Sequence, residues 1–290
     1  MSRMLRFVIL AACGLALMPA TAGAQGSPQQ VYALVVDSDG YPVRGLSAED
    51  FSLRDGSVRQ AVLGAEPATN PVWLAVVVQG FATGDLPQVR AAIEALASTA
   101  RQGPAGSHTG VMRPASATSA WLDLASGVSD AAWQSLVDGP RPPVLDAIGQ
   151  AAVALRQAPT DRRAIVLLIK QSPATAFVVS RGLLTDQLFT AGAALWTVEV
   201  AGTSASNATT GSSPDAVKLD DVLNDATKFS GSLREHVADT AGIIPLAERI
   251  GHLVLAQYVV TYLWPNPMLS TFSIATRHDR GDVLVPAWAR

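Results

Sequence analysis

The chain has 290 residues and a formal net charge of −3, and 49% of its residues are hydrophobic while only 16% are charged. This composition is typical of a compact globular protein and argues against intrinsic disorder. Because no run of lysines or arginines occurs anywhere, we expect binding neither to nucleic acid nor to an anionic membrane surface.

The first 24 residues have the pattern of a secretory signal peptide. Arg3 and Arg6 precede an apolar segment at 7–18, and Ala22-Gly23-Ala24 offers small residues for cleavage. No segment reaches the ~18 apolar residues that a spanning helix needs. We therefore expect a secreted or periplasmic protein without a transmembrane segment. The mature chain would have 19 basic and 24 acidic residues and no cysteine, which excludes disulfides and cysteine nucleophiles.

An alternative interpretation of the same segment is a lipid anchor. Leu10-Ala11-Ala12-Cys13 resembles a bacterial lipoprotein box, in which Cys13 would be lipidated. The apolar run continues past Cys13, and cleavage there would leave an unusually short signal. Simple export is therefore preferred, and a membrane-anchored lipoprotein is the alternative.

Residues 25–66 predict a small β module. The segments 31–36, 51–53 and 58–62 have strand character, and Asp37-Ser38-Asp39-Gly40 and Asp55-Gly56 are turn signals between them. Residues 47–50 predict a single helical turn, and 66–71 predicts a linker.

An unbroken apolar segment at 72–78, bounded by Pro71 and Gly80, predicts a central strand of a parallel sheet covered on both faces. Asp85 and Pro87 then begin an amphipathic helix. Its inward face consists of Val89, Ile93, Leu96 and Ala100. A strand, a tight turn and a helix in this order place the turn at the carboxyl edge of the sheet, where open α/β folds bind ligands.

Beyond this unit, predicted strands and helices alternate, which is typical of a doubly wound sheet. Strands are expected at 109–112, 119–124, 164–169 and 194–200, and helices at 129–136, 144–157, 181–191, 217–229 and 244–255. The Gly-, Ser- and Thr-rich segment 201–215 predicts a mobile loop.

The chain ends in three predicted strands, at 257–263, 271–276 and 283–285. We expect the carboxy-terminal strands to pack with the amino-terminal β module beside the main sheet. The predicted fold class is thus α/β, a doubly wound, mainly parallel sheet with a small β module. The predicted limits are 1–24 for the signal peptide, 25–66 for the β module, 71–264 for the α/β domain and 265–290 for the final strands.

The strand and turn at 71–83 resemble the first unit of a von Willebrand factor type A domain. The string "VVDSDGYPVRGLSAEDFSLRDGSVRQ" resembles the β module that often precedes this domain in bacterial secreted proteins. The string "LAERIGHLVLAQYVVTYLWP" resembles the end of the bacterial type A group. The resemblance implies a Rossmann-type sheet and, in the family, a divalent metal site formed by three loops at one edge of it.

The positions that match the family's metal ligands hold residues of other types. Gln79, Phe81 and Thr83 match the family's Asp-x-Ser-x-Ser, Pro142 stands where the second loop has threonine, and Lys170 follows the strand that precedes the third loop's aspartate. Hard divalent cations need oxygen ligands, whereas a lysine ammonium offers three donors and no acceptor. We therefore expect no metal ion and no other cofactor.

Two of these positions leave an alternative open. Lys170 is either a solvated lysine at the end of a strand, which is preferred, or a charge that replaces the cation and pairs with Asp146 or with a partner's carboxylate. Phe81 either packs on its own domain, which is preferred, or is an exposed anchor for a partner.

The resulting hypothesis is an exported, non-enzymatic interaction module that binds an unknown protein partner in the periplasm or the extracellular space. Its candidate binding edge consists of Gln79, Phe81, Thr83, Pro142, Asp146 and Lys170. The alternatives are a structural envelope lipoprotein anchored through Cys13 and a hydrolase in which Asp146, Lys170 and Ser172 cluster. The four histidines have no metal-ligand spacing, and no G-x-S-x-G motif occurs.

Overall fold

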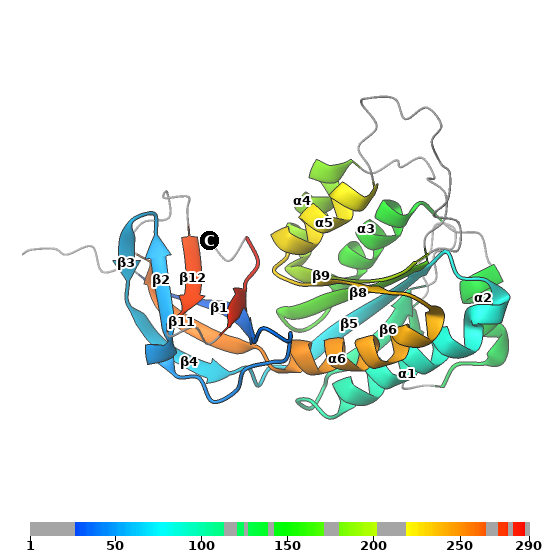
Figure 1. Cartoon of the computed structure of the whole chain (residues 1–290), viewed down its shortest axis with the longest axis horizontal. Helices are drawn as coiled ribbons and strands as arrows, with labels where there is room; N and C mark the ends of the chain where they lie inside the picture. Colours follow the sequence, from blue (N-terminus) through cyan, green and yellow to red (C-terminus); the bar gives the residue numbers. More distant parts are fainter. Residues whose placement is uncertain are drawn as a thin grey trace, which may run out of the picture.

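The structure is a computed structural model of the chain and describes residues 27–112, 121–124, 127–138, 142–170, 180–201, 219–264, 272–277 and 281–287. Two parts lie side by side: an α/β part formed by the middle of the chain and a β module formed by its two ends (Figure 1). The expected signal peptide with Cys13 and most of the expected loop 201–215 lie outside the described residues.

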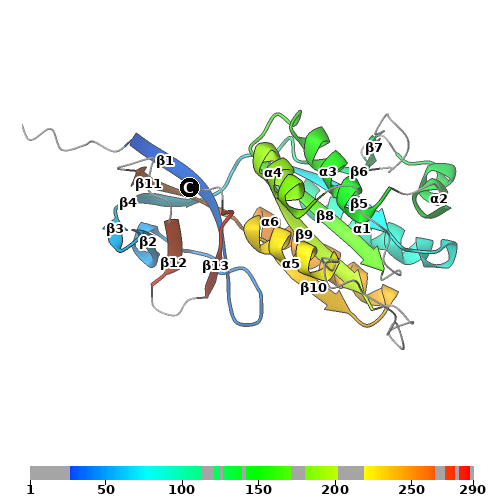
Figure 2. The same ribbon diagram turned by 90° about the horizontal axis from the view of Figure 1, so that it is seen from above.

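The α/β part is built on one six-stranded sheet with the order β10-β9-β8-β5-β6-β7. These strands are β5 (Val72–Gln79), β6 (His108–Met112), β7 (Trp121–Asp123), β8 (Arg162–Lys170), β9 (Ala193–Val200) and β10 (Arg234–Val237). All neighbouring pairs are parallel except β6 with β7, which is antiparallel. Figure 2 shows the parallel strands side by side. The predicted fold class is confirmed.

Helices cover both faces of this sheet (Figure 1). One face is packed by α1 (Leu86–Arg101) and α6 (Ile243–Leu255), with α2 (Asp130–Asp138) beside them; the other is packed by α3 (Val144–Leu155), α4 (Arg181–Ala191) and α5 (Leu219–Phe229). Side chains of a strand alternate between faces. Val76 and Val78 of β5 accordingly join the core under α1 and α6, while Ala75 and Val77 join the core under α3. Burial on both faces explains the continuous apolar runs of the central strands.

The β module consists of two packed antiparallel sheets. The first has the order β13-β1-β11-β4, and the second has the order β12-β2-β3. The strands are β1 (Ser27–Val36), β2 (Phe51–Asp55), β3 (Val58–Gln60), β4 (Val62–Pro67), β11 (Tyr258–Trp264), β12 (Phe272–Thr276) and β13 (Asp282–Leu284). Phe51, Leu53, Val260 and Ile274 meet in the core between the sheets. The expected packing of the final strands with the amino-terminal block is therefore confirmed.

Three details differ from the sequence-based expectation. The predicted strand 58–62 is divided between β3 and β4, and β4 continues through Pro67 into the expected linker 66–71. The edge strand β10 was not predicted, because its sequence Arg-Glu-His-Val lacks the apolar pattern of the buried strands. The strand β11, which falls within the limits predicted for the larger domain, pairs with β1 and β4 of the β module. Among the described residues, no helix has the length and the hydropathy needed to cross a bilayer.

A buried arginine joins the two parts where the chain passes between them. Arg162, at the start of β8, is 2% exposed. Its guanidinium donates hydrogen bonds to the carbonyls of Ala68 (3.1 Å) and Asn70 (2.7 Å), in the connection from β4 to β5. It also donates to the carbonyl of Val254 (2.7 Å), near the end of α6 and just before the connection to β11. Burial lowers the pKa of Arg162 to about 10. One side chain thus holds both connections between the β module and the α/β part.

Candidate functional site

The candidate site lies at the carboxyl edge of the main sheet, where the chain leaves β5 and β8. The chain turns at Gly80, whose φ is +79°, and enters the 3-10 turn η2 (Thr83–Asp85) that leads into α1. A Cβ atom at Gly80 would lie 2.1 Å from the carbonyl oxygen of Lys170. Only glycine therefore allows the turn after β5 to pass this close to the end of β8.

The centre of this edge is an ion pair between Lys170 and Asp85. The Lys170 Nζ lies 2.9 Å from each carboxylate oxygen of Asp85. The carboxylate also accepts hydrogen bonds from the Thr240 hydroxyl (3.1 Å) and the Ala82 amide (2.9 Å). The side chains of Lys170 and Asp85 are 26% and 15% exposed. The pair therefore joins three segments of the edge: η2, the end of β8 and the turn η4 (Thr240–Gly242).

These contacts decide the ionisation of Asp85. Burial opposes ionisation, but the hydrogen bonds from Ala82, Lys170 and Thr240 outweigh it, so the pKa of Asp85 lies below its ordinary value of 3.8. A carboxylate with these donors stays charged at neutral pH. The positive charge of Lys170 is thus compensated within the protein.

The structure corrects the preferred expectation for Lys170. It is not a solvated lysine, because it is largely buried and ion-paired. The alternative, in which the ammonium pairs with a carboxylate, is correct in kind, but the described partner is Asp85 in place of Asp146. The sequence holds a signal for this pair: Asp85 begins the helix after β5, Lys170 ends β8, and β5 and β8 are neighbours.

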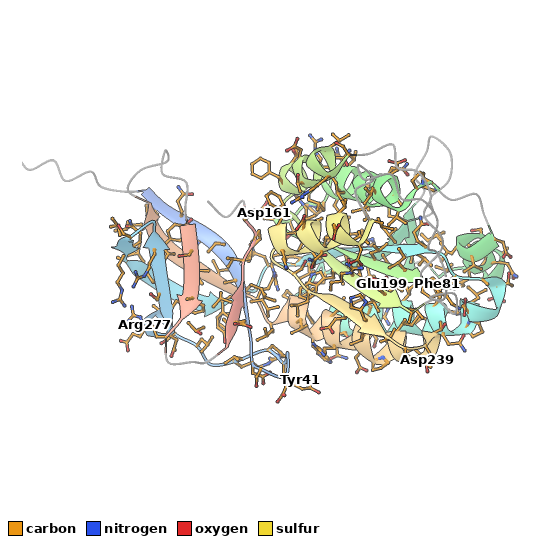
Figure 3. All side chains as sticks on the ribbon, turned by 45° about the horizontal axis from the view of Figure 1, so that its top comes forward. Tyr41, Phe81, Asp161, Glu199, Asp239 and Arg277 are labelled. Carbon is orange, nitrogen blue, oxygen red and sulfur yellow. The ribbon has the colours of Figure 1, made fainter. Side chains whose placement is uncertain are left out.

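Two of the expected edge residues are not at the surface. Phe81 is 2% exposed and belongs to the core under α1, so its packing interpretation is confirmed and the exposed anchor is wrong. Figure 3 shows Phe81 inside the α/β part. Gln79 is also buried, and its Nε2 has no hydrogen-bond partner.

The structure also describes three of the remaining expected residues. Thr83 is exposed in η2, and its hydroxyl donates a 2.6 Å hydrogen bond to Asp138 at the end of α2. Pro142 is half-buried just before α3, and Asp146 lies in the first turn of α3. Ser172, the third member of the hydrolase hypothesis, lies outside the described residues.

The donor set at this edge does not fit the divalent ion that the resemblance implies. The Asp85 carboxylate accepts hydrogen bonds from an ammonium, a hydroxyl and an amide, so its oxygens are not available as ligands for a hard cation. In the described part of the chain, no group of three or more His, Cys, Asp or Glu side chains could hold a metal ion. Lys170 would also repel a cation placed beside it.

A second charged cluster secures the outer strand β10. The buried carboxylate of Glu199 on β9 pairs with Arg234, which also pairs with Asp220 of α5. Burial opposes the charge of Arg234, but the hydrogen bonds to Glu199 and Asp220 outweigh it and raise its pKa. The His236 Nδ1 lies 3.5 Å from Glu199 Oε2. Arg234 compensates the charge of buried Glu199, and its two ion pairs attach β10 and α5 to the sheet.

Comparison with known proteins gives no family assignment. No family model matches the chain, and no curated protein matches it. Among solved structures, proximal thread matrix protein 1 from the mussel byssus is 12% identical, with a TM-score of 0.38, over 73% of this chain and 49% of that one. The human COPII-coat protein Sec24c is 11% identical, with a TM-score of 0.40, over 87% of this chain and 47% of that one.

A third neighbour, the amino-terminal domain of TFIIH p34, is 11% identical, with a TM-score of 0.35, over 62% of this chain and 98% of that one. The chain thus spans about half the length of the first two proteins. With TM-scores of 0.40 or below, none of these likenesses supports a conclusion about what this chain does.

Proposed function

We propose that the protein is an exported interaction module that binds a protein partner at the carboxyl edge of a von Willebrand factor A-like sheet without a divalent metal. The observation that supports this proposal is the ion pair between Lys170 and Asp85. The ion pair joins η2 to the end of β8, and its carboxylate also accepts a hydrogen bond from Thr240 of η4. Holding three segments together is the structural role that a bound cation has where three loops converge. A metal ion is then unnecessary for the order of this edge.

Within the described residues, the same pair leaves a donor for a partner. An ammonium has three N–H donors, and the partners described for Lys170 are the two oxygens of Asp85. Because Lys170 remains 26% exposed, the third donor can meet an acceptor that approaches from outside. Beside it, Ala82 to Gly84 are exposed, and so are Asp239 and Ala241 on either side of half-buried Thr240. They offer a contact surface whose backbone is fixed by the ion pair and by hydrogen bonds that Asp85 and Asp239 accept at either turn.

No observation favours an enzyme. Among the described residues, Lys170 and the Thr240 hydroxyl both donate to Asp85, and this arrangement supports no base–nucleophile pair with Lys170 as the base. Export through the signal peptide, and the lipoprotein alternative through Cys13, concern residues outside the described part and are part of the proposal.

The test is affinity capture of a partner from the cell envelope with three forms of the mature protein, each in the presence of EDTA. Gly84→Arg places a bulky side chain on the exposed turn η2, where a Cβ meets nothing within 4 Å. Gly64→Arg is the matched control on β4, where a Cβ also meets nothing within 4 Å. We expect wild type and Gly64→Arg to retain the partner and Gly84→Arg to lose it. Capture that requires Mg²⁺, or that survives Gly84→Arg, would refute the proposal.

A further inference from the structure

Two arginines of one hairpin, and a third from near the end of the chain, lie at the second sheet of the β module. Arg54 on β2 and Arg59 on β3 are register partners, and Arg277 follows β12 with its amide bonded to the Asp50 carbonyl at 2.7 Å. Side chains alternate along a strand, and Leu53 of β2 points into the core. Arg54 and Arg59 therefore point outward. Figure 3 shows Arg277 at the end of the module that faces away from the α/β part.

A hollow of about 420 Å³ lies beside two of these arginines. Its polar lining consists of Arg59, Arg277, Gln60 and Glu49, and its apolar lining consists of Ala48, Ala61 and Val62. The volume lies in the range of sites that bind small groups in proteins. We name this feature the arginine hollow.

Within the described ranges, no ion pair neutralises the guanidiniums of the arginine hollow, in contrast to those of Arg90, Arg181, Arg234 and Arg249. The Nε of Arg277 is buried, and the described part of the chain gives it no hydrogen-bond partner. A buried N–H without an acceptor is unfavourable, so an acceptor brought by a ligand would be stabilising. Glu49 is exposed at the rim.

We infer that the arginine hollow binds a carboxylate, supplied by an acidic side chain of a partner polypeptide. Two guanidiniums at one site can hold both oxygens of a carboxylate with charge-assisted hydrogen bonds. Ala48, Ala61 and Val62 give the methylene groups of a glutamate an apolar wall. A hollow of this size admits one side chain and its flanking backbone, whereas a membrane surface or a nucleic acid needs a broad positive surface. This chain is acidic overall, so the positive charge is local.

This site is separate from the carboxyl edge. It lies in the β module, where it is lined by residues 48–49, by the end of β3, by the start of β4 and by Arg277 after β12, while the edge is formed by the α/β part. Its occupancy therefore does not depend on the function proposed for that edge. Binding at the arginine hollow should be unaffected by Gly84→Arg.

The test measures the fluorescence anisotropy of a labelled flexible peptide containing glutamates, with a peptide in which glutamine replaces each glutamate as the control. We expect saturable binding of the glutamate peptide to the mature protein and binding at least about tenfold weaker for the glutamine peptide. Arg59→Gln and Arg277→Gln should each weaken binding about tenfold, whereas Arg44→Gln, at an exposed arginine outside the hollow, should leave it unchanged. Arg59 is exposed, so its replacement leaves the fold intact.

Three results would overturn the inference. Equal affinity for the two peptides would show that the carboxylate is not recognised. If Arg44→Gln weakened binding as much as Arg59→Gln, the binding would be a general attraction between opposite charges. If free glutarate displaced the peptide with a dissociation constant lower than that of the peptide itself, the ligand would be a small organic acid and not a polypeptide. Binding of anionic vesicles that depends on Arg59 and exceeds peptide binding would favour a lipid surface.

Discussion

Replacement of Arg162 by methionine removes the side chain that holds both connections between the two parts. Methionine keeps much of the volume but donates no hydrogen bond, so the carbonyls of Ala68, Asn70 and Val254 lose donors at 3.1 Å or less. Each buried carbonyl left without a donor costs about 1–2 kcal/mol. Methionine also removes the free-energy cost of burying the guanidinium charge, and this offsets part of the loss. We expect the free energy of unfolding to fall by about 3–4 kcal/mol.

The assay is urea unfolding followed by circular dichroism, with Arg163→Met as a graded control. Arg163 donates to two carbonyls, those of Ala191 (2.8 Å) and Ala158 (3.0 Å), and is half-buried. We expect its replacement to cost about 1–2 kcal/mol. If Arg162→Met were as stable as wild type, or more stable than Arg163→Met, the role assigned to Arg162 at the junction would be wrong.

Further predictions concern the carboxyl edge and the amino terminus. Gly80→Ala should cost at least about 2 kcal/mol, because its φ is +79° and its Cβ would lie 2.1 Å from the Lys170 carbonyl oxygen; Gly84→Ala should stay within about 0.5 kcal/mol of wild type in the same melts. Asp85→Asn should lower the free energy of unfolding by about 1–2 kcal/mol at pH 7. Because the folded-state pKa of Asp85 lies below 3.8, its contribution is present above pH 3.8 and is lost as the pH falls through the lowered value, so the two stability curves should converge in acid; parallel curves would contradict this. Metabolic lipid labelling should mark neither the wild type nor Cys13→Ala, and a label lost in the variant would establish the anchored alternative.

Much of the fold could be predicted because burial leaves a periodic trace. The unbroken apolar run predicts β5, and the helical period of 3.6 predicts the inward positions Val89, Ile93 and Leu96 of α1; the structure places these residues in the core. The edge strand β10 has no such trace, because its outward and inward residues are all polar up to Val237. Its position depends on the ion pairs of Arg234, which involve residues distant in sequence.

The candidate site was predicted less completely than the fold. The sequence placed Gln79 and Lys170 at the correct edge, but the partner of Lys170 is 85 positions away and depends on the path of a turn. The burial of Arg162 leaves no local signal, since Asp161 and Arg163 beside it make the segment look solvated. The arginine hollow combines β3 with a residue after β12, which no run of charge in the sequence reveals.

The central claim is that the Lys170 ammonium takes the place of a divalent cation at the carboxyl edge. The most direct test is thermal unfolding of the mature protein in EDTA and in millimolar Mg²⁺ or Mn²⁺, with calorimetric titration of the same ions. The account predicts the same melting temperature in all three conditions and no heat of binding. An increase of several degrees with either ion would show that the edge binds a cation and would contradict the account.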